Sequence, residues 1–175
     1  DNVHNNLPEQ LTEFVGRQTE LADAIRLIGE TRLLTILAPG GTGKTRLAIQ
    51  TAEEVCTDYA DGVFFVGFAD ISSNDDIVQT IAESLGVALS GDVDLKTQLL
   101  TYLAPRRQLL VLDNLEHLIE ASAQVVDTLL HAAPGLRILG TAREALGIAG
   151  EAAYPVRSLP VPSASAATAA EVRGC

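Results

Sequence analysis

The chain has 175 residues, the size of one globular domain, and hydrophobic residues make up 47% of it, enough for a real core. Twelve Lys and Arg against 23 Asp and Glu give a formal net charge of −11, so we expect no direct binding of nucleic acid by this segment. No apolar run reaches the roughly 18 residues of a membrane helix and no signal pattern opens the chain, which predicts a cytoplasmic chain without membrane contact.

Two further absences bear on the organisation of the protein. The sequence contains no Met and begins with Asp1, which indicates a trimmed piece of a longer protein whose other domains act with this one. Its two cysteines and three scattered histidines show no metal-ligand spacing, so we expect neither a disulfide framework nor a structural metal site.

Short β-rich apolar runs alternate with longer segments of helical period, a pattern typical of parallel βαβ units. Four of the runs are almost continuously apolar, which favours strands covered on both faces, whereas the fifth contains a proline and belongs at a sheet edge. The predicted elements are, in chain order, a helix over 19–28, a strand over 33–38, a helix over 44–55, a strand over 62–67, helices over 75–85 and 95–103, a strand over 108–113, a helix over 115–131, and strands over 136–141 and 153–157. This order predicts an α/β fold, with helices on a mainly parallel sheet of about five strands.

A glycine-rich octamer joins the first predicted strand to the next helix. Residues 38–45 read Ala-Pro-Gly-Gly-Thr-Gly-Lys-Thr, the Walker A arrangement with alanine in the first position. The glycines let the backbone turn with positive φ and bring several N–H groups close to phosphate oxygens, while Lys44 supplies a full charge and Thr45 a hydroxyl for Mg²⁺. The alternative is a glycine-rich turn without a ligand. The predicted nucleotide-binding residues here are Pro39, Gly40, Gly41, Thr42, Gly43, Lys44, Thr45 and Arg46.

The third predicted strand ends in Asp113, which matches Walker B, whose carboxylate holds Mg²⁺, usually through water. Alternatively, Asp113 caps the following helix. The next residue is Asn114, and because its amide cannot accept a proton from water, the sequence argues against fast hydrolysis. Glu116 and His117 follow as candidate catalytic groups or as solvent-facing helix residues.

The fourth predicted strand is followed by Arg143. Parallel strands end at one edge of a sheet, so this arginine would reach the γ phosphate there and report its presence. An ion pair with Glu144 or another acid is the alternative. We predict Lys44, Asp113 and Arg143 as catalytic residues, and Thr45 and Asp113 as the residues that hold Mg²⁺, Asp113 through water.

Four blocks of sequence together resemble the STAND class of P-loop NTPases, which includes NB-ARC and apoptotic ATPases. The resemblance is closest to the group found in bacterial multidomain transcriptional regulators. The blocks lie in order over about residues 7–162: LPEQLTEFVGR from residue 7, the Walker A loop running into Arg-Leu-Ala, LVLDNLEH from residue 110, and TAREALG from residue 141 leading to Tyr-Pro-Val and Leu-Pro.

This resemblance implies that Val15, Gly16 and Arg17 contact adenine or ribose and that Arg143 is the sensor arginine. It also implies a P-loop NTPase fold, a three-layer αβα sandwich of the additional-strand order, with the Walker B strand beside the Walker A strand. Members of the class act as switches, closed with ADP and open or oligomeric with ATP. The implied ligands are therefore ATP or ADP with Mg²⁺, and the implied partners are further domains of the same chain and nucleotide-dependent self-association.

We expect an N-terminal adenine-side segment and helix over residues 1–30, a P-loop NTPase core over 31–160, and a linker or the truncated start of a helical domain over 161–175. The favoured function is an ATP/ADP-binding regulatory switch with slow or partner-dependent hydrolysis. The alternatives are a constitutively active ATP-hydrolysing enzyme and a degenerate scaffold that binds nothing. A small-molecule kinase is disfavoured, because the sequence offers no obvious acceptor site or Arg-rich lid.

Overall fold

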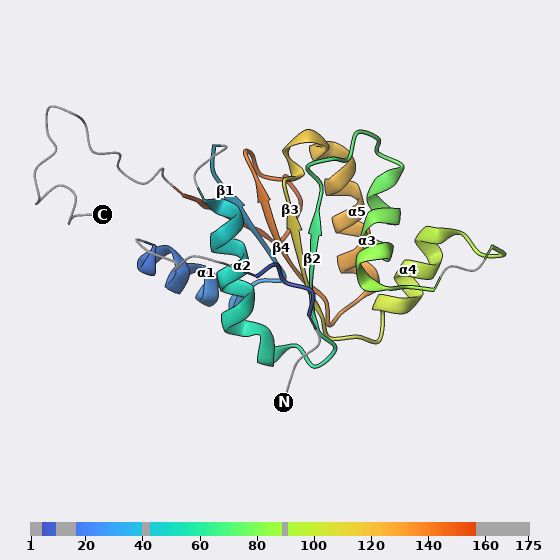
Figure 1. Cartoon of the computed structure of the whole chain (residues 1–175), viewed down its shortest axis with the longest axis horizontal. Coiled ribbons are helices and arrows are strands. Elements are labelled where there is room, and N and C mark those ends of the chain that lie inside the picture. The colour runs from blue at the N-terminus through green and yellow to red at the C-terminus, as the bar shows by residue number, and fades with distance from the viewer. Residues whose placement is uncertain (1–4, 10–16, 40–42, 89–90, 157–175) are drawn as a thin grey trace, which may run out of the picture.

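The computed structural model describes residues 5–9, 17–39, 43–88 and 91–156 (Figure 1). Both the strands and the helices follow the predicted chain order, with bounds that differ by a few residues from the expected ones. The elements are α1 (Gln18–Glu30), β1 (Leu33–Leu37), α2 (Lys44–Val55), the 3-10 helix η1 (Cys56–Asp58), β2 (Val63–Gly67), α3 (Asp76–Leu85), α4 (Leu95–Leu103), β3 (Leu109–Asp113), the 3-10 helix η2 (Leu115–His117), α5 (Ile119–Ala132), β4 (Arg137–Ala142) and β5 (Glu151–Pro155).

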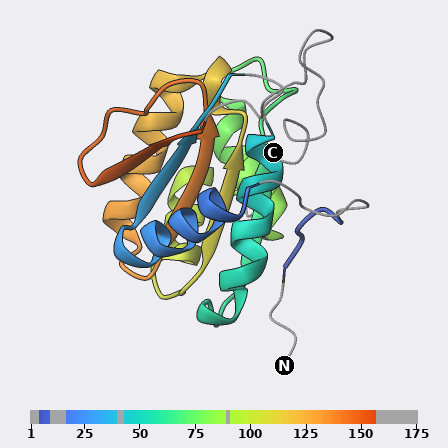
Figure 2. The same ribbon diagram turned by 90° about the vertical axis from the view of Figure 1, so that its left-hand side faces the viewer.

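The elements form three layers around one sheet. All paired strands are parallel, and their order is β2-β3-β4-β1-β5. Helices α1 and α2 cover one face of the sheet, and α3, α4 and α5 cover the other, as Figures 1 and 2 show from two directions. This architecture confirms the predicted α/β sandwich with a five-stranded parallel sheet.

Strand β3 shows why the apolar runs of the sequence are almost continuous. Leu109 and Val111 pack into the core beneath α1 and α2, whereas Leu110 and Leu112 pack into the core beneath α3, α4 and α5. Every residue of β3 is buried. Successive side chains of a strand point to opposite faces, so a strand covered by helices on both sides needs apolar residues at every position.

The order of the central strands corrects one expectation. The strand that precedes the Walker A segment is β1 and the strand that ends in Asp113 is β3, and these two strands are not neighbours, because β4 pairs with both of them. The additional-strand order is therefore present, but the implied adjacency of the Walker A and Walker B strands was wrong. The register brings Ile138 of β4 beside Leu33 of β1 and Leu110 of β3.

The helix expected over 115–131 is broken into η2 and α5. Asn114 has a φ of 63°, in the left-handed region, and Leu118, at the junction, has a φ of −139°, outside the helical range. Asparagine tolerates the left-handed conformation better than most residues because its short polar side chain bonds locally. The chain therefore turns sharply after β3 and enters α5 only at Ile119.

Both edge strands of the sheet are bonded to the N-terminal part of the chain. At the β2 edge, Asn5 forms a parallel bridge with Val63, and the Asn6 amide both donates to the carbonyl of Phe65 and accepts from its N–H. At the other edge, the Tyr154 hydroxyl of β5 donates to Asp23 Oδ2 of α1 at 2.6 Å. The proline predicted to mark an edge strand, Pro155, does lie on β5.

None of the helices in the described part of the chain is long and apolar enough to cross a membrane. The boundaries expected at residues 30/31 and 160/161 stay predictions, and residues 161–175 lie outside the described ranges.

The bond between α1 and β5 generates a prediction about pH. Burial, the hydrogen bond to Asp23 and the charge of that carboxylate together raise the pKa of Tyr154 from 10.0 to about 12. Because the folded-state pKa exceeds the unfolded one, protonated Tyr154 stabilises the fold below pH 10, and this contribution is lost as the pH rises through 12. Urea unfolding should therefore show the stability difference between the wild type and Tyr154→Phe shrinking from pH 10 to 12.

A phenolate absorbance titration provides the control. The highest tyrosine transition should be absent in Tyr154→Phe and should move down only partly in Asp23→Asn, because burial is the largest cause of the shift. A constant stability difference across this pH range would contradict the assignment.

Candidate functional site

The carboxyl ends of β1, β3 and β4 meet at one edge of the sheet, where α2 also begins (Figure 1). In open parallel sheets, ligands bind at this edge. Several predicted site residues, namely Val15, Gly16, Gly40, Gly41 and Thr42, lie outside the described residues. The remaining ones are Arg17, Pro39, Gly43, Lys44, Thr45, Arg46, Asp113 and Arg143.

Helix α2 begins as the Walker A motif predicts. Gly43 is its N-cap residue and has a φ of 82°, a conformation that glycine adopts without a steric penalty. The first turn, which contains Lys44 and Thr45, includes no acidic residue, so the helix itself places no negative charge at the positive end of its dipole. This helix end is thus electrically suited to an anion.

Asp113 joins three elements through one oxygen. Its Oδ1 accepts hydrogen bonds from the Thr45 hydroxyl of α2 at 2.8 Å and from the Thr141 hydroxyl of β4 at 2.6 Å. The residue is only 6% exposed. The alternative role of Asp113 as a helix cap is not what the structure shows, because η2 has Asn114 as its N-cap and no side-chain cap bond.

Thr141 is a site residue that we did not single out from the sequence. It is fully buried at the end of β4, and its hydroxyl also accepts a hydrogen bond from the Asn114 N–H at 2.9 Å. The turn after β3 is thereby held to β4. The available signal was a polar residue at the end of an apolar strand. With β1 and β3 expected to be neighbours, however, the strand that carries Thr141 was not expected between them.

Lys44 is paired with Glu116 rather than exposed to solvent. Its Nζ lies 3.2 Å from Glu116 Oε1, and the two side chains are 6% and 11% exposed. The sharp turn at Asn114 directs Glu116 back toward α2, so the alternative that it faces solvent on a helix was wrong. His117 is exposed.

The three predicted arginines differ in their surroundings. Arg17, the N-cap residue of α1, is 2% exposed, and a side-chain carbon on Gly43 would lie 3.8 Å from its Nε, so Arg17 lies beside the start of α2. Arg46 is partly buried on α2. Arg143 is exposed after β4, and within the described ranges its side chain makes no ion pair with Glu144 or another acid.

The loop that carries Arg143 is held by Glu151, a second residue that the sequence did not reveal. Its carboxylate accepts hydrogen bonds from the backbone N–H groups of Leu146 and Gly147, both at 2.9 Å, and from the buried Thr35 hydroxyl of β1 at 2.6 Å. A carboxylate that accepts several N–H and O–H groups fixes their positions. Glu151 therefore ties the loop between β4 and β5 to the centre of the sheet.

The oxygens of Thr45 and Asp113 fit a magnesium ion that is bound together with a nucleotide. Mg²⁺ prefers hard oxygen ligands and is usually held by one or two carboxylates together with substrate phosphates and water. One hydroxyl and one carboxylate oxygen, 2.8 Å apart beside the buried Lys44, match this requirement. Groups of three or more His, Cys, Asp or Glu side chains, as a site built from protein alone would use, are absent from the described residues.

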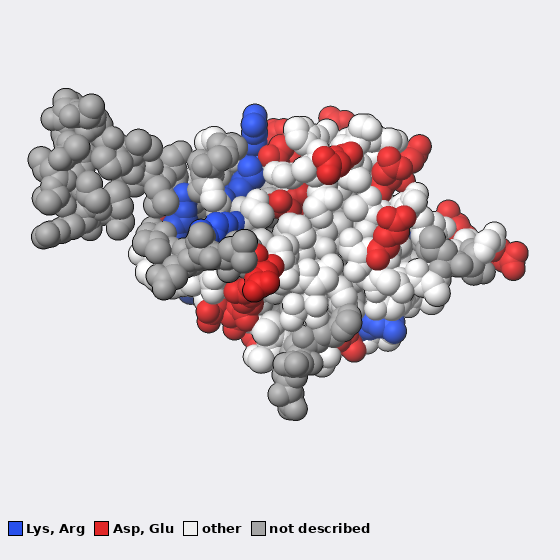
Figure 3. Space-filling view, in the orientation of Figure 1, with Lys and Arg blue, Asp and Glu red and all other residues white. Residues whose placement is uncertain are grey.

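The charges on the molecular surface are unevenly distributed. On the face drawn in Figure 3, most Lys and Arg atoms gather near the start of α2, whereas Asp and Glu atoms are spread over the remaining surface. On this face of a chain with a net charge of −11, an anionic ligand therefore meets less repulsion near the start of α2 than over the remaining surface.

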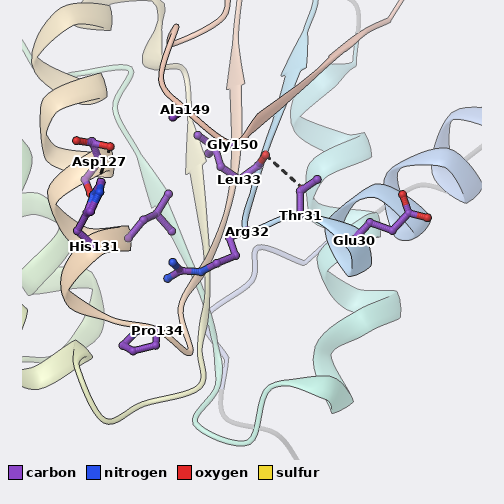
Figure 4. Close-up of a pocket in the computed structure, with 10 residues that line it drawn as sticks. Glu30, Thr31, Arg32, Leu33, Asp127, His131, Pro134, Ala149 and Gly150 are labelled. Carbon is purple, nitrogen blue, oxygen red and sulfur yellow. Dashed lines mark hydrogen bonds and ion pairs between the residues drawn. The ribbon is translucent and has the colours of Figure 1, made fainter.

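A cavity of about 570 Å³ lies at the opposite edge of the sheet, where the strands begin (Figure 4). It is lined by Arg32, just before β1, by Gly150, just before β5, and by the last turns of α5 with Asp127 and His131. The guanidinium of Arg32 donates to the carbonyls of Ala133 and Leu136. These bonds hold the end of α5 against the sheet, and the cavity contains none of the predicted site residues.

Comparisons with known proteins identify relatives of this chain. A family model described as an AAA domain matches residues 26–142. An uncharacterized protein of Mycobacterium tuberculosis is 36% identical over 157 residues, which are 90% of this chain and 40% of that protein. A putative HTH-type transcriptional regulator of the same organism is 40% identical over 135 residues, 77% of this chain and 15% of that protein. The chain thus spans 40% of the length of the curated relatives it matches first.

Two solved structures share the fold. Drosophila ORC, solved bound to DNA, has a chain with a TM-score of 0.59 and 19% identity, covering 84% of this chain and 44% of that one. A STAND protein with a tetratricopeptide repeat sensor from Pyrococcus horikoshii has a TM-score of 0.51 and 16% identity, covering 85% and 24%. Such likenesses confirm the P-loop NTPase fold alone. The DNA belongs to ORC, and our expectation of no nucleic-acid contact stays a prediction.

The hydrogen bonds of Thr141 generate a stability prediction. Thr141→Val keeps the shape of the side chain but removes the hydroxyl, which leaves Asp113 with one donor fewer and the Asn114 N–H without its acceptor. Urea denaturation should show a loss of about 1–3 kcal/mol in the free energy of unfolding. Thr128→Val, which removes an exposed hydroxyl from α5, should change it by less than about 0.5 kcal/mol. Equal effects of the two substitutions would contradict the role given to Thr141.

Proposed function

This chain belongs to the AAA domain family, and on that premise we propose that it is the nucleotide-binding domain of a regulatory ATP/ADP switch of the STAND type. One observation supports this proposal above the others. One carboxylate oxygen of Asp113 accepts hydrogen bonds from the hydroxyls of Thr45 and Thr141, which lie on two other elements. This oxygen lies at the carboxyl edge of the sheet, beside the buried Lys44. This is an arrangement that a polyphosphate with Mg²⁺ would use.

In this proposal each residue has a defined task. Lys44 would bind the β and γ phosphates, and Thr45 and Asp113 would hold Mg²⁺, Asp113 through water. The backbone from Pro39 to Gly43 and the start of α2 with Arg46 would surround the phosphates. The Mg²⁺ ion would neutralise phosphate charge. Arg143 senses the γ phosphate. Adenine or ribose would be contacted by Val15, Gly16 and Arg17. The position of Arg17 beside Gly43 is compatible with this role.

The turn after β3 argues for slow rather than fast hydrolysis. Asn114 stands where a water-activating carboxylate often follows the Walker B aspartate, and an amide cannot accept the proton. Its left-handed conformation gives it a different task, because it reverses the chain direction toward Glu116. A switch with slow or partner-dependent hydrolysis fits these residues better than a constitutively active ATP-hydrolysing enzyme.

A switch works through differential affinity, because each tenfold preference for one nucleotide shifts a conformational equilibrium by about 1.4 kcal/mol. The other conformation would involve parts outside this segment, since the HTH-type regulator that it resembles is far longer than the matched region. Further domains of the same chain and a nucleotide-dependent second copy are the proposed partners.

Lys44→Ala tests the nucleotide site directly. Calorimetry with MgADP should show affinity about 10- to 100-fold weaker than that of the wild type, because a charged hydrogen-bond partner of the phosphates is lost. The control is Lys96→Ala, which removes the only other lysine of the chain from an exposed position on α4 and should leave the affinity unchanged. Binding that survives unaltered in Lys44→Ala would reject the assignment.

Turnover and ligand-induced stability separate the three functions. For the switch we expect phosphate release thousands of times slower than about 1 per second, a rate within the common range of enzymes. We also expect MgADP at 100 times its Kd to add about 2.7 kcal/mol of stability, which a degenerate scaffold would not show. Release near 1 per second would instead identify a constitutive ATPase.

A further inference from the structure

The Lys44 side chain lies in a buried environment and has an anionic partner within the chain itself. Its Nζ donates to Glu116 Oε1 at 3.2 Å, and both side chains are almost inaccessible to solvent. A buried lysine without a counter-charge is strongly unfavourable, because the protein interior replaces little of its hydration. Glu116 therefore provides the counter-charge beside Lys44 when no phosphate is present.

The backbone between β3 and α5 places Glu116 at this position. The left-handed residue Asn114 reverses the chain, its N–H bonds to Thr141, and Leu115 is buried at 1% exposure beside β4. These three features fix η2 on the sheet, and Glu116 lies in its middle. The pair with Lys44 is thus set by the fold and is not an accidental meeting of two flexible surface side chains.

Only one of the two carboxylate oxygens of Glu116 is bonded in the Lys44–Glu116 pair. Glu116 Oε2 is buried and accepts no hydrogen bond from the described part of the chain. A buried carboxylate oxygen without a donor is costly, and it makes this ion pair weaker than one in which both oxygens are bonded. The Lys44–Glu116 pair is therefore a contact that a better-coordinated anion can replace.

From these observations we propose that Glu116 is a built-in competitor for Lys44, a positioning residue that must release the lysine when a nucleotide phosphate binds. The inference rests on the proposed function, since it concerns the same lysine. A phosphate group would bring a second anion to a site that already holds a carboxylate. Glu116 therefore lowers the affinity for nucleotide and keeps the ligand-free state ordered.

This role differs from that of a catalytic base. A base acts on water near the γ phosphate, and its removal slows hydrolysis without strengthening binding of a nucleotide that lacks the γ phosphate. A competitor acts on binding itself, and its removal strengthens binding of ADP as well as ATP. MgADP is therefore the informative probe.

The test compares Glu116→Gln with Glu120→Gln in the same protein. Both substitutions remove one negative charge, but Glu120 is exposed in the first turn of α5 and forms no ion pair with another described residue. Calorimetry with MgADP should show about tenfold tighter binding for Glu116→Gln, the equivalent of about 1.4 kcal/mol, and binding within about twofold of the wild type for Glu120→Gln.

Thermal melting gives a second readout. Without nucleotide, Glu116→Gln should melt several degrees below the wild type, because Lys44 then keeps no charged partner. With saturating MgADP, the two melting temperatures should approach each other, since phosphate replaces the missing carboxylate. If Glu116→Gln does not fold, Glu116→Asp shortens the carboxylate by one methylene and should show a smaller shift toward tighter binding.

Equal or weaker MgADP binding in the folded Glu116 variants would overturn the inference, because it would mean that Glu116 helps the lysine meet the phosphate. Failure of the wild type itself to bind MgADP would overturn the proposed function instead. The two failures are thus distinguished by the wild-type titration alone.

Discussion

One carboxylate oxygen holds the functional edge of this molecule together. Oδ1 of Asp113 receives the hydroxyls of Thr45 and Thr141, and so connects the start of α2 to the ends of β3 and β4. The three residues are far apart in the sequence and come together only because the parallel strands β3 and β4 end side by side. The start of α2, the turn at Asn114 and the position of Glu116 all depend on this junction.

Much of the fold follows from the sequence, because burial on both faces makes each central strand an apolar run that is easy to recognise. The Walker A segment and Asp113 were likewise recognisable, since each needs a particular residue type next to such a run. The neighbours of β1 in the sheet could not be recognised, because the local sequence pattern contains no information about which strand pairs with which. The mistaken adjacency concealed Thr141, whose importance arises from the position of β4 between β1 and β3.

The position of Glu116 was missed for a different reason. The apolar spacing after Asp113 is compatible with one continuous helix, and a helix would have placed Glu116 on its first turn. The left-handed backbone of Asn114 ends that continuity, and hydrophobic periodicity does not detect a single unusual dihedral angle. An asparagine directly after a strand is a signal for such a turn, because asparagine tolerates the left-handed conformation better than most residues. Glu151 was missed because its three donors lie in a loop and on another strand.

The amide of Asn6 has a consequence for the solution behaviour of the domain. An outer strand whose N–H and C=O groups point into water is a template on which a second molecule can add its own strand, and this is a common origin of aggregation. The Asn6 side chain bonds to both the N–H and the C=O of Phe65, as the backbone of a neighbouring strand would. A truncated version that starts beyond this residue would expose a β-rich, aromatic border to intermolecular pairing. Asn6 thus contributes to keeping neighbouring copies apart.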